Sequence, residues 1–242
     1  MEFNIDDIIY WQEGFLKVNA TLLNSWVVML FLIFLSWLIT RKLTSGLNIR
    51  RGQAFIESFV VFVLDQIREE THEDADKYLP FIGTLFLFIV VSNVIGVIPG
   101  FDSPTASLST ATALAICVFI AVPVFGISNR GFAGYMKHYV QPTPFMLPFN
   151  IIGELSRTLA LAIRLFGNIM SGSLIIAIVL SLSPLFFPVV MQAFGLLIGV
   201  IQAYVFAILA LVYIASATRI QNLKELENEE SGKKGNENKS TE

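Results

Sequence analysis

Four long runs of this sequence contain no Asp, Glu, Lys or Arg, and this segregation of charge limits the possible folds most. The runs cover residues 18–40, 78–101, 103–129 and 165–218. Each is at least as long as the roughly 20 apolar residues that a helix needs to cross the hydrocarbon core of a membrane. Because 55% of the residues are hydrophobic and 14% are charged, the chain cannot cover itself with polar groups. The sequence therefore predicts an all-α protein that crosses a membrane several times.

Charged residues between these runs predict the topology. The amino terminus is acidic, and the first expected span, residues 22–40, is followed by four basic residues, Arg41, Lys42, Arg50 and Arg51. Basic loops stay on the cytoplasmic side, so we expect the amino terminus outside and the carboxyl terminus in the cytoplasm. Further spans are expected over residues 79–98 and 108–127. Residues 53–70 mix apolar and charged side chains, which indicates an amphipathic helix in the cytoplasmic interface.

The second half of the chain predicts two helices that are too long to cross a membrane upright. Residues 148–183 have a helical pattern that ends before Pro184, and a second pattern of similar length covers residues 188–218. A helix of about 35 residues is about 50 Å long, whereas the hydrocarbon core is about 30 Å thick. We therefore expect these two helices to form a long, strongly tilted hairpin.

The expected organisation is a single membrane-embedded domain over residues 1–220. Segment 221–242 is rich in charged residues and Asn and has almost no apolar residues, which is typical of a disordered cytoplasmic tail. In total the sequence predicts an integral, multi-pass membrane protein with about five membrane-embedded helices and one interfacial amphipathic helix.

Arg164 is the residue that most needs an explanation. A guanidinium near the centre of a membrane costs several kcal/mol unless it faces protein or water, so an intramembrane arginine indicates a functional site. At about 100° per residue, one helical stripe contains two cations, two small polar residues and a leucine. Its members are Arg157, Leu161, Arg164, Asn168 and Ser171. Neighbouring glycines and serines would let another helix approach this stripe closely.

A second stripe, on the last expected helix, consists of small residues and one amide. Its members are Gly195, Gly199, Gln202, Ala203, Ala207 and Ala210. Small residues commonly serve close helix packing in membranes, and this is the simplest interpretation of the glycines and alanines. Gln202 differs, because a buried amide needs hydrogen-bond partners. We expect these partners in the Arg164 region or in a chain of water.

Four stretches of the chain carry a resemblance to a known family. Residues 162–168 read Ala-Ile-Arg-Leu-Phe-Gly-Asn, which resembles the Leu-Arg-Leu-Phe-Gly-Asn signature of ATP synthase subunit a. Residues 201–206, Ile-Gln-Ala-Tyr-Val-Phe, are similar to the second signature of that family. Residues 139–144 and 80–88 are similar to stretches of its chloroplast and bacterial forms. The likeness covers about residues 10–218 in order.

The resemblance implies a role as the ion-conducting stator of a rotary F-type ATP synthase in a bacterial plasma membrane. Ions would enter by one half-channel, bind a carboxylate of the rotating c-ring, and leave by a second half-channel, coupling H⁺ or Na⁺ flow to rotation. The tilted hairpin would lie against the ring, and peripheral-stalk b subunits and the lipid bilayer would be further partners. Arg164 would stand between the half-channels, with Asn168 and Gln202 nearby. Its fixed charge would favour the ionised form of a passing carboxylate and eject the bound cation.

Two charged residues on the same helix keep two interpretations each. Arg157 matches a position that is often basic in the family, and it is equally well explained as an interfacial residue whose charged end reaches the membrane surface. Glu154 is explained most simply as an i, i+3 partner of Arg157. Its functional interpretation is a lining group of the cytoplasmic half-channel.

Three positions depart from the family's proton-conducting pattern. The family usually has a carboxylate nine residues beyond the arginine, a histidine or acid on the facing helix, and often an aspartate near the start of the third span. Here these positions hold Ser173, Gly195 and Ser107. Either water and hydroxyl groups carry protons there, or the ion is Na⁺, for which neutral oxygens are adequate ligands. The pattern is similar to an alternate, sodium-associated branch, which favours Na⁺, although selectivity is expected mainly in the ring.

Other functional classes find little support in the sequence. It contains no nucleotide-binding glycine loop, no cluster of metal ligands and no nucleophile motif, so we expect no catalysis, no cofactor and no nucleic acid. ATP chemistry must then occur on another subunit. The alternative function is a stand-alone ion channel or secondary transporter with Arg164 as a counter-ion. Inverted repeats and paired Gly or Pro breaks, which are common in secondary transporters, are not evident.

Overall fold

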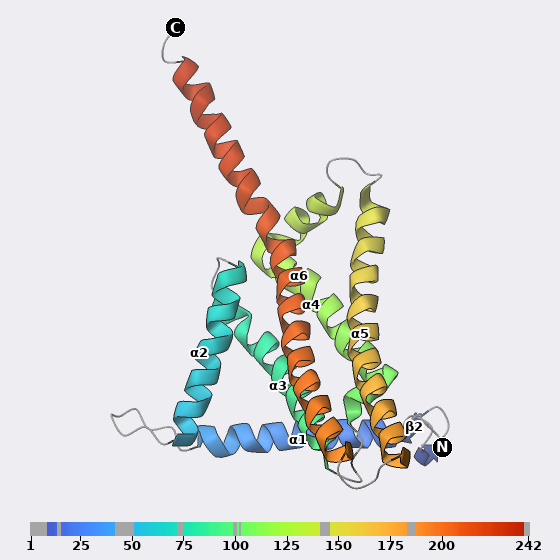
Figure 1. Ribbon diagram of the computed structural model, residues 1–242. Coiled ribbons are helices and arrows are strands. Elements are labelled where there is room, and N and C mark those ends of the chain that lie inside the picture. The colour runs from blue at the N-terminus through green and yellow to red at the C-terminus, as the bar shows by residue number, and fades with distance from the viewer. Residues whose placement is uncertain are drawn as a thin grey trace.

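The structure is a computed structural model that describes residues 9–13, 16–41, 51–71, 75–98, 101, 103–140, 146–182 and 187–239. Six α-helices make up most of it (Figure 1). Their bounds are α1 Ala20–Thr40, α2 Arg51–Thr71, α3 Leu79–Ile95, α4 Leu108–Val140, α5 Met146–Leu182 and α6 Phe187–Lys239. Two short 3-10 turns, η2 (Ala75–Lys77) and η3 (Pro104–Ala106), lead into α3 and α4. The predicted all-α membrane architecture is confirmed.

Four helices are long and apolar enough to cross a membrane, and α3 is a shorter apolar helix. The four lie in α1, α4, α5 and α6, so the expected number of about five membrane-embedded helices holds. Helix α3 ends at Ile95, earlier than the expected span end at residue 98, because the chain turns at Gly96. Helix α4 runs further than expected, to Val140, and bends at Gly131, whose φ of 73° a glycine adopts easily.

A small two-stranded hairpin precedes α1, which the sequence analysis did not predict. Strand β1 (Ile9–Glu13) pairs antiparallel with β2 (Leu16–Asn19). The opposite end of the chain also differs from expectation, since α6 continues as helix to Lys239, whereas we expected disorder over residues 221–242. Leu, Lys and Glu, which favour helix, recur after Gln221 and explain how the helix can continue.

The directions of the helices fit a tilted hairpin. Figure 1 shows α1 running across the common direction of α2, α5 and α6. The 21 residues of α1 give a length of about 31 Å, close to the thickness of a hydrocarbon core. With α1 upright in the membrane, α2 and the α5–α6 hairpin therefore lie nearer to the membrane plane.

The core lies where α3, α4, α5 and α6 meet. Among its fully buried side chains are Ile89, Val118, Leu161, Leu165, Phe206 and Leu211. Helix α6 contributes more buried core residues than any other helix and contacts α2, α3, α4 and α5. Helix α5 is very different, because 6% of its most apolar stretch is buried. Most of its surface is therefore left for lipid or for another protein.

Candidate functional site

Two contacts define how α5 and α6 pair. The side-chain amide of Asn168 donates a hydrogen bond to Oε1 of Gln202, at 2.6 Å. Further along the hairpin, the Arg157 guanidinium lies over the Tyr213 ring, 5.7 Å from its centre. Both pairs belong to one antiparallel register, which places Arg164 at the level of Phe206. The two signature segments found in the sequence are therefore side by side.

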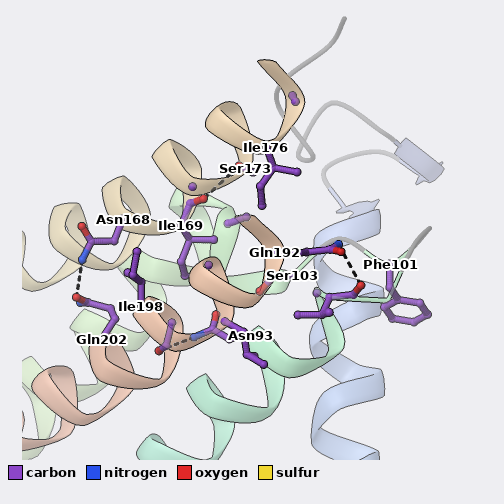
Figure 2. A pocket seen from close by; sticks show the side chains of 18 residues that line it. Asn93, Phe101, Ser103, Asn168, Ile169, Ser173, Ile176, Gln192, Ile198 and Gln202 are labelled. Carbon is purple, nitrogen blue, oxygen red and sulfur yellow. Dashed lines mark hydrogen bonds between the residues drawn. The ribbon is translucent and has the colours of Figure 1, made fainter. Parts of the chain in front are cut away.

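A cavity of about 380 Å³ opens between α5, α6, the end of α3 and the loop that follows it (Figure 2). From α5 it is lined by residues that include Asn168, Gly172 and Ser173, and from α6 by Gln192, Gly195, Gly199 and Gln202. Asn93, Phe101 and Ser103 close it on the third side. These four α6 residues lie along one face of the helix at helical spacing. The two glycines leave the space open, and the two glutamines are uncharged.

The described lining of the cavity is largely apolar, and the polar side chains in it are uncharged. None of the described residues that line it is an acid, a base or a histidine. Ser173 and Gly195, two of the positions that lack the family's usual titratable groups, both line it. The Ser173 hydroxyl donates to backbone carbonyls of its own helix, at Ile169 and Met170. The third position, Ser107, is buried and hydrogen-bonded to Ser109 at the start of α4.

Gln202 is the most enclosed polar side chain on this wall, with 4% of its surface exposed. Its oxygen accepts the hydrogen bond from Asn168, one helical turn beyond Arg164. Its nitrogen, Nε2, has no hydrogen-bond partner among the described residues. We expected Gln202 to find a partner in the Arg164 region, and the structure supplies one in Asn168.

Arg164 itself is exposed on the outer face of α5. Among the described residues we find no hydrogen bond or ion pair for its guanidinium. Leu159 and Ile163, further round the same helix, are 59% and 55% exposed. An unpaired cation is costly in lipid, so Arg164 needs a protein partner or water.

The predicted polar stripe on α5 holds with one exception. Arg157, Arg164, Asn168 and Ser171 are all exposed, but Leu161 is 1% exposed and packs in the core. On a helix Leu161 lies at the edge of the stripe, about 40° from Arg157 and toward the buried side. Leu161 therefore belongs to the stripe by spacing but packs in the core, unlike the four polar members.

The other two charged candidates lie toward the amino-terminal end of α5. Arg157 keeps its contact with Tyr213, which anchors its guanidinium against α6. Glu154 is half-buried, and its backbone carbonyl accepts a hydrogen bond from the Thr158 hydroxyl at 3.0 Å. Neither residue lines the described cavity.

The sequence analysis missed the third wall of the cavity. Asn93 donates a hydrogen bond to the Gly199 carbonyl at 2.9 Å and accepts one from Thr105 at 3.0 Å. Gln192 donates to the Val97 carbonyl at 3.2 Å. The available signal was an isolated asparagine near the end of the otherwise apolar 79–98 run, which needs buried partners.

Fold and site together define a class of protein: a multi-pass membrane protein in which an uncharged cavity with several amide and hydroxyl groups lies near an exposed arginine that is unpaired among the described residues. A family profile described as ATP synthase A chain matches residues 22–215. The chain therefore belongs to the ATP synthase subunit a family, as the sequence motifs suggested. This family is the ion-translocating, non-catalytic membrane subunit of the Fo sector, and catalysis lies in the F1 subunits.

Individual relatives agree with this assignment over nearly the whole chain. The chain is 56% identical over 220 residues to "ATP synthase subunit a 2" of Acaryochloris marina, covering 91% of this chain and 94% of the relative. It is 56% identical over 224 residues to "ATP synthase subunit a 1" of Crocosphaera subtropica, covering 93% and 97%. It is 57% identical over 219 residues to "ATP synthase subunit a 1" of Chlorobaculum parvum, covering 90% and 97%.

Proposed function

We propose that this subunit couples ion flow to rotation through two half-channels separated by Arg164. The observation that supports this proposal most is the position of Arg164. Its side chain is exposed and unpaired among the described residues, and it lies one turn from the hydrogen bond between Asn168 and Gln202. The cavity, with amide and hydroxyl groups in its wall, supplies a route into the apolar part of the hairpin. A route that ends beside a fixed positive charge is suited to passing a cation onto a partner group.

The partner that fits this face is a rotating ring of c subunits that carry carboxylates. A carboxylate that reaches Arg164 is favoured in its ionised form and therefore releases its cation. An arginine remains charged even when water is excluded, which a lysine in the same place need not. The bare surface of α5 gives the ring room to approach, because its side chains there are exposed.

We assign the cavity to the half-channel that opens outside the cell, with the amino terminus outside and the carboxyl terminus in the cytoplasm. Asn168, Gln202 and Ser173 belong to this route. Glu154 and Arg157 lie at the opposite end of α5 and are candidates for the cytoplasmic half-channel. Peripheral-stalk b subunits would complete the stator in a bacterial plasma membrane.

The neutral lining bears on the transported ion. Side-chain oxygens of amides and hydroxyls are adequate ligands for Na⁺, whereas a relay of protons between side chains needs groups that titrate. The described lining has the first kind and lacks the second. It therefore supports Na⁺, with water-carried protons as the alternative.

Substitution of Arg164 tests the proposal. In the assembled complex in vesicles, Arg164→Ala is expected to abolish both ATP synthesis and ATP-driven ion pumping while ATP hydrolysis by the soluble part continues. Arg68→Ala is the control, since it removes an exposed cation of α2 that lies outside the proposed seam. Native pumping by an assembled Arg164→Ala complex would refute the role of this residue.

The ion is tested separately. ATP-driven uptake of ²²Na⁺ into vesicles is measured with and without a protonophore. Sodium transport predicts that uptake continues, or rises, when the protonophore is present. Pumping that the protonophore abolishes and that Na⁺ cannot support would show that protons are the coupling ion.

A further inference from the structure

The third wall of the cavity is tied to α6 by a chain of buried hydrogen bonds. The hydroxyls of Ser103 and Thr105 are 2.7 Å apart, and Thr105 donates to Oδ1 of Asn93. Asn93 then donates from Nδ2 to the Gly199 carbonyl, across the boundary between α3 and α6. Thr105 is fully buried and Asn93 is 8% exposed, so both bonds of Asn93 are buried, whereas the bond between Ser103 and Thr105 is partly buried. We call this chain of bonds the Asn93 clamp.

The clamp depends on a glycine at position 199. A Cβ atom built there would lie 2.9 Å from Nδ2, 3.0 Å from Cγ and 3.1 Å from Cβ of Asn93. These distances are shorter than ordinary contacts, so a side chain at position 199 would force Asn93 to shift. Gly195, one turn earlier, is different, because its Cβ would meet one side-chain atom of Ile176 at 3.7 Å, an ordinary contact.

The clamp holds α6 next to its functional amide. Gly199 lies three residues before Gln202, so fixing its carbonyl fixes the height and rotation of Gln202 on the helix. Gln192, two turns earlier on the same face, adds a second tie to the Val97 carbonyl. Both hydrogen bonds run to α3 and to the turn that follows it. Together they position α6 relative to α3.

We propose that Asn93 is a positioning residue for ion entry, which sets α6 so that Gln202 meets Asn168 at the inner end of the cavity. This inference rests on the proposed function of the cavity as an ion route. It assigns Asn93 a task beyond lining that route, since its amide acts on the backbone of α6 and through it on Gln202.

One pair of substitutions distinguishes the effect of breaking the clamp from the effect of adding a methyl group elsewhere. Gly199→Ala leaves the chemistry of Asn93 unchanged but forces it away from α6, and we expect ion translocation to fall about tenfold, as for a broken buried hydrogen bond. Gly83→Ala adds the same methyl group to α3 outside the cavity, at a position where a Cβ meets nothing within 4 Å, and is expected to retain native translocation. The double variant Asn93→Ala with Gly199→Ala should be no worse than the poorer single variant, because both remove one interaction.

A pH profile provides a readout that loss of packing alone would not give. In Asn93→Asp the side chain can donate to the Gly199 carbonyl only while it is protonated. Translocation relative to the native complex at the same pH should therefore be largely kept at low pH and fall as the pH rises. Asn93→Ala should be low at every pH. A flat profile for Asn93→Asp would contradict the clamp.

Cross-linking tests the position of α6 without relying on translocation. Cysteines replace Asn168 and Gln202 in a Cys117→Ser background, and a short bifunctional thiol reagent is applied to the assembled complex. Asn93→Ala and Gly199→Ala should each lower the cross-linked fraction severalfold, and Gly83→Ala should not. Reduced translocation with unchanged cross-linking would overturn the positioning role. Because this yield does not depend on ion flow, it stands even if Arg164 fails its own test.

Discussion

The two halves of the α5–α6 hairpin are built differently. In the open half, residues 168–181 of α5 and 187–198 of α6, no described side chain is buried. In the packed half, residues 161–165 and 203–215, α5 contributes Leu161 and Leu165, and α6 contributes Phe206, Leu211 and Ile214, all at most 1% exposed. The cavity lies along the open half, and Arg164 lies at the level where the packed half begins.

On the proposed function, this difference indicates where an ion can travel. Tightly packed side chains leave no room for water, so an ion that follows the open half cannot continue straight along the hairpin. It must leave sideways, over the exposed face of α5, where Arg164 lies. The contrast between the halves thus gives a physical reason for transfer onto a moving partner instead of passage through a continuous pore.

Filling the open half should have the largest effect. Gly172 lines the cavity, and a Cβ built there meets nothing within 4 Å, so Gly172→Phe should place its ring in the cavity. We expect ATP-driven pumping to fall about a hundredfold, the effect of a few kcal/mol of overpacking on the ion's path. Gly153→Phe, at an equally open position of α5 outside the cavity, is the control. Native pumping by the Gly172 variant would show that ions do not use this cavity.

Shortening a buried side chain in the packed half should lower the stability of the subunit. Phe206 is fully buried, and Phe206→Ala should destabilise the subunit by about 2 kcal/mol, less than in water because lipid replaces part of the lost contact. The measurement is thermal unfolding of the purified complex. Val189→Ala, at a site that is 67% exposed in the open half, should leave the melting temperature unchanged. Equal destabilisation by both variants would remove the distinction between the halves.

The contact between Arg157 and Tyr213 should matter less. Arg157→Ala removes a cation–π pair within the hairpin, and we expect a loss of about 1 kcal/mol in stability and a modest loss of pumping. Arg157→Lys keeps a cation over the ring and should recover most of both. A loss of pumping as large as that of Arg164→Ala, with stability retained, would instead place Arg157 in the ion path.

Ser173→Ala should have the smallest effect. The hydroxyl is bonded to carbonyls of its own helix, so its removal should change pumping by less than about twofold. Initial pumping rates in vesicles measure this directly. A large loss would favour the alternative in which hydroxyl groups of the open half carry protons.

Local sequence patterns predicted much of this molecule. Charge-free runs located the helices, the length of residues 148–183 required a tilted hairpin, and Arg164 was evident as a charge within an apolar pattern. These features depend on composition and helical period, which act over a few turns. The end of α3 was predicted less well, because the turn at Gly96 is fixed by contact with Ser103 as well as by local sequence.

Features that depend on packing between distant segments were not predictable from one sequence. The Asn93 clamp joins residues 106 positions apart, and no periodicity indicates that pairing. Leu161 shows the same limit within one helix, since its place at the edge of a polar stripe left its burial to be decided by α4 and α6. The uncharged character of the cavity was foreseen at Ser173 and Gly195, but its third wall was not.

Accessibility along α5 tests the boundary at Arg164 most directly. Single cysteines replace Gly172 in the open half and Leu165 in the packed half, in a Cys117→Ser background, and a charged, membrane-impermeant thiol reagent is added from outside. We predict rapid labelling at position 172 and none at position 165 until the complex is unfolded. Labelling of position 165 in the folded complex at the same rate as position 172 would show that water passes Arg164, and the two-half-channel account would be wrong.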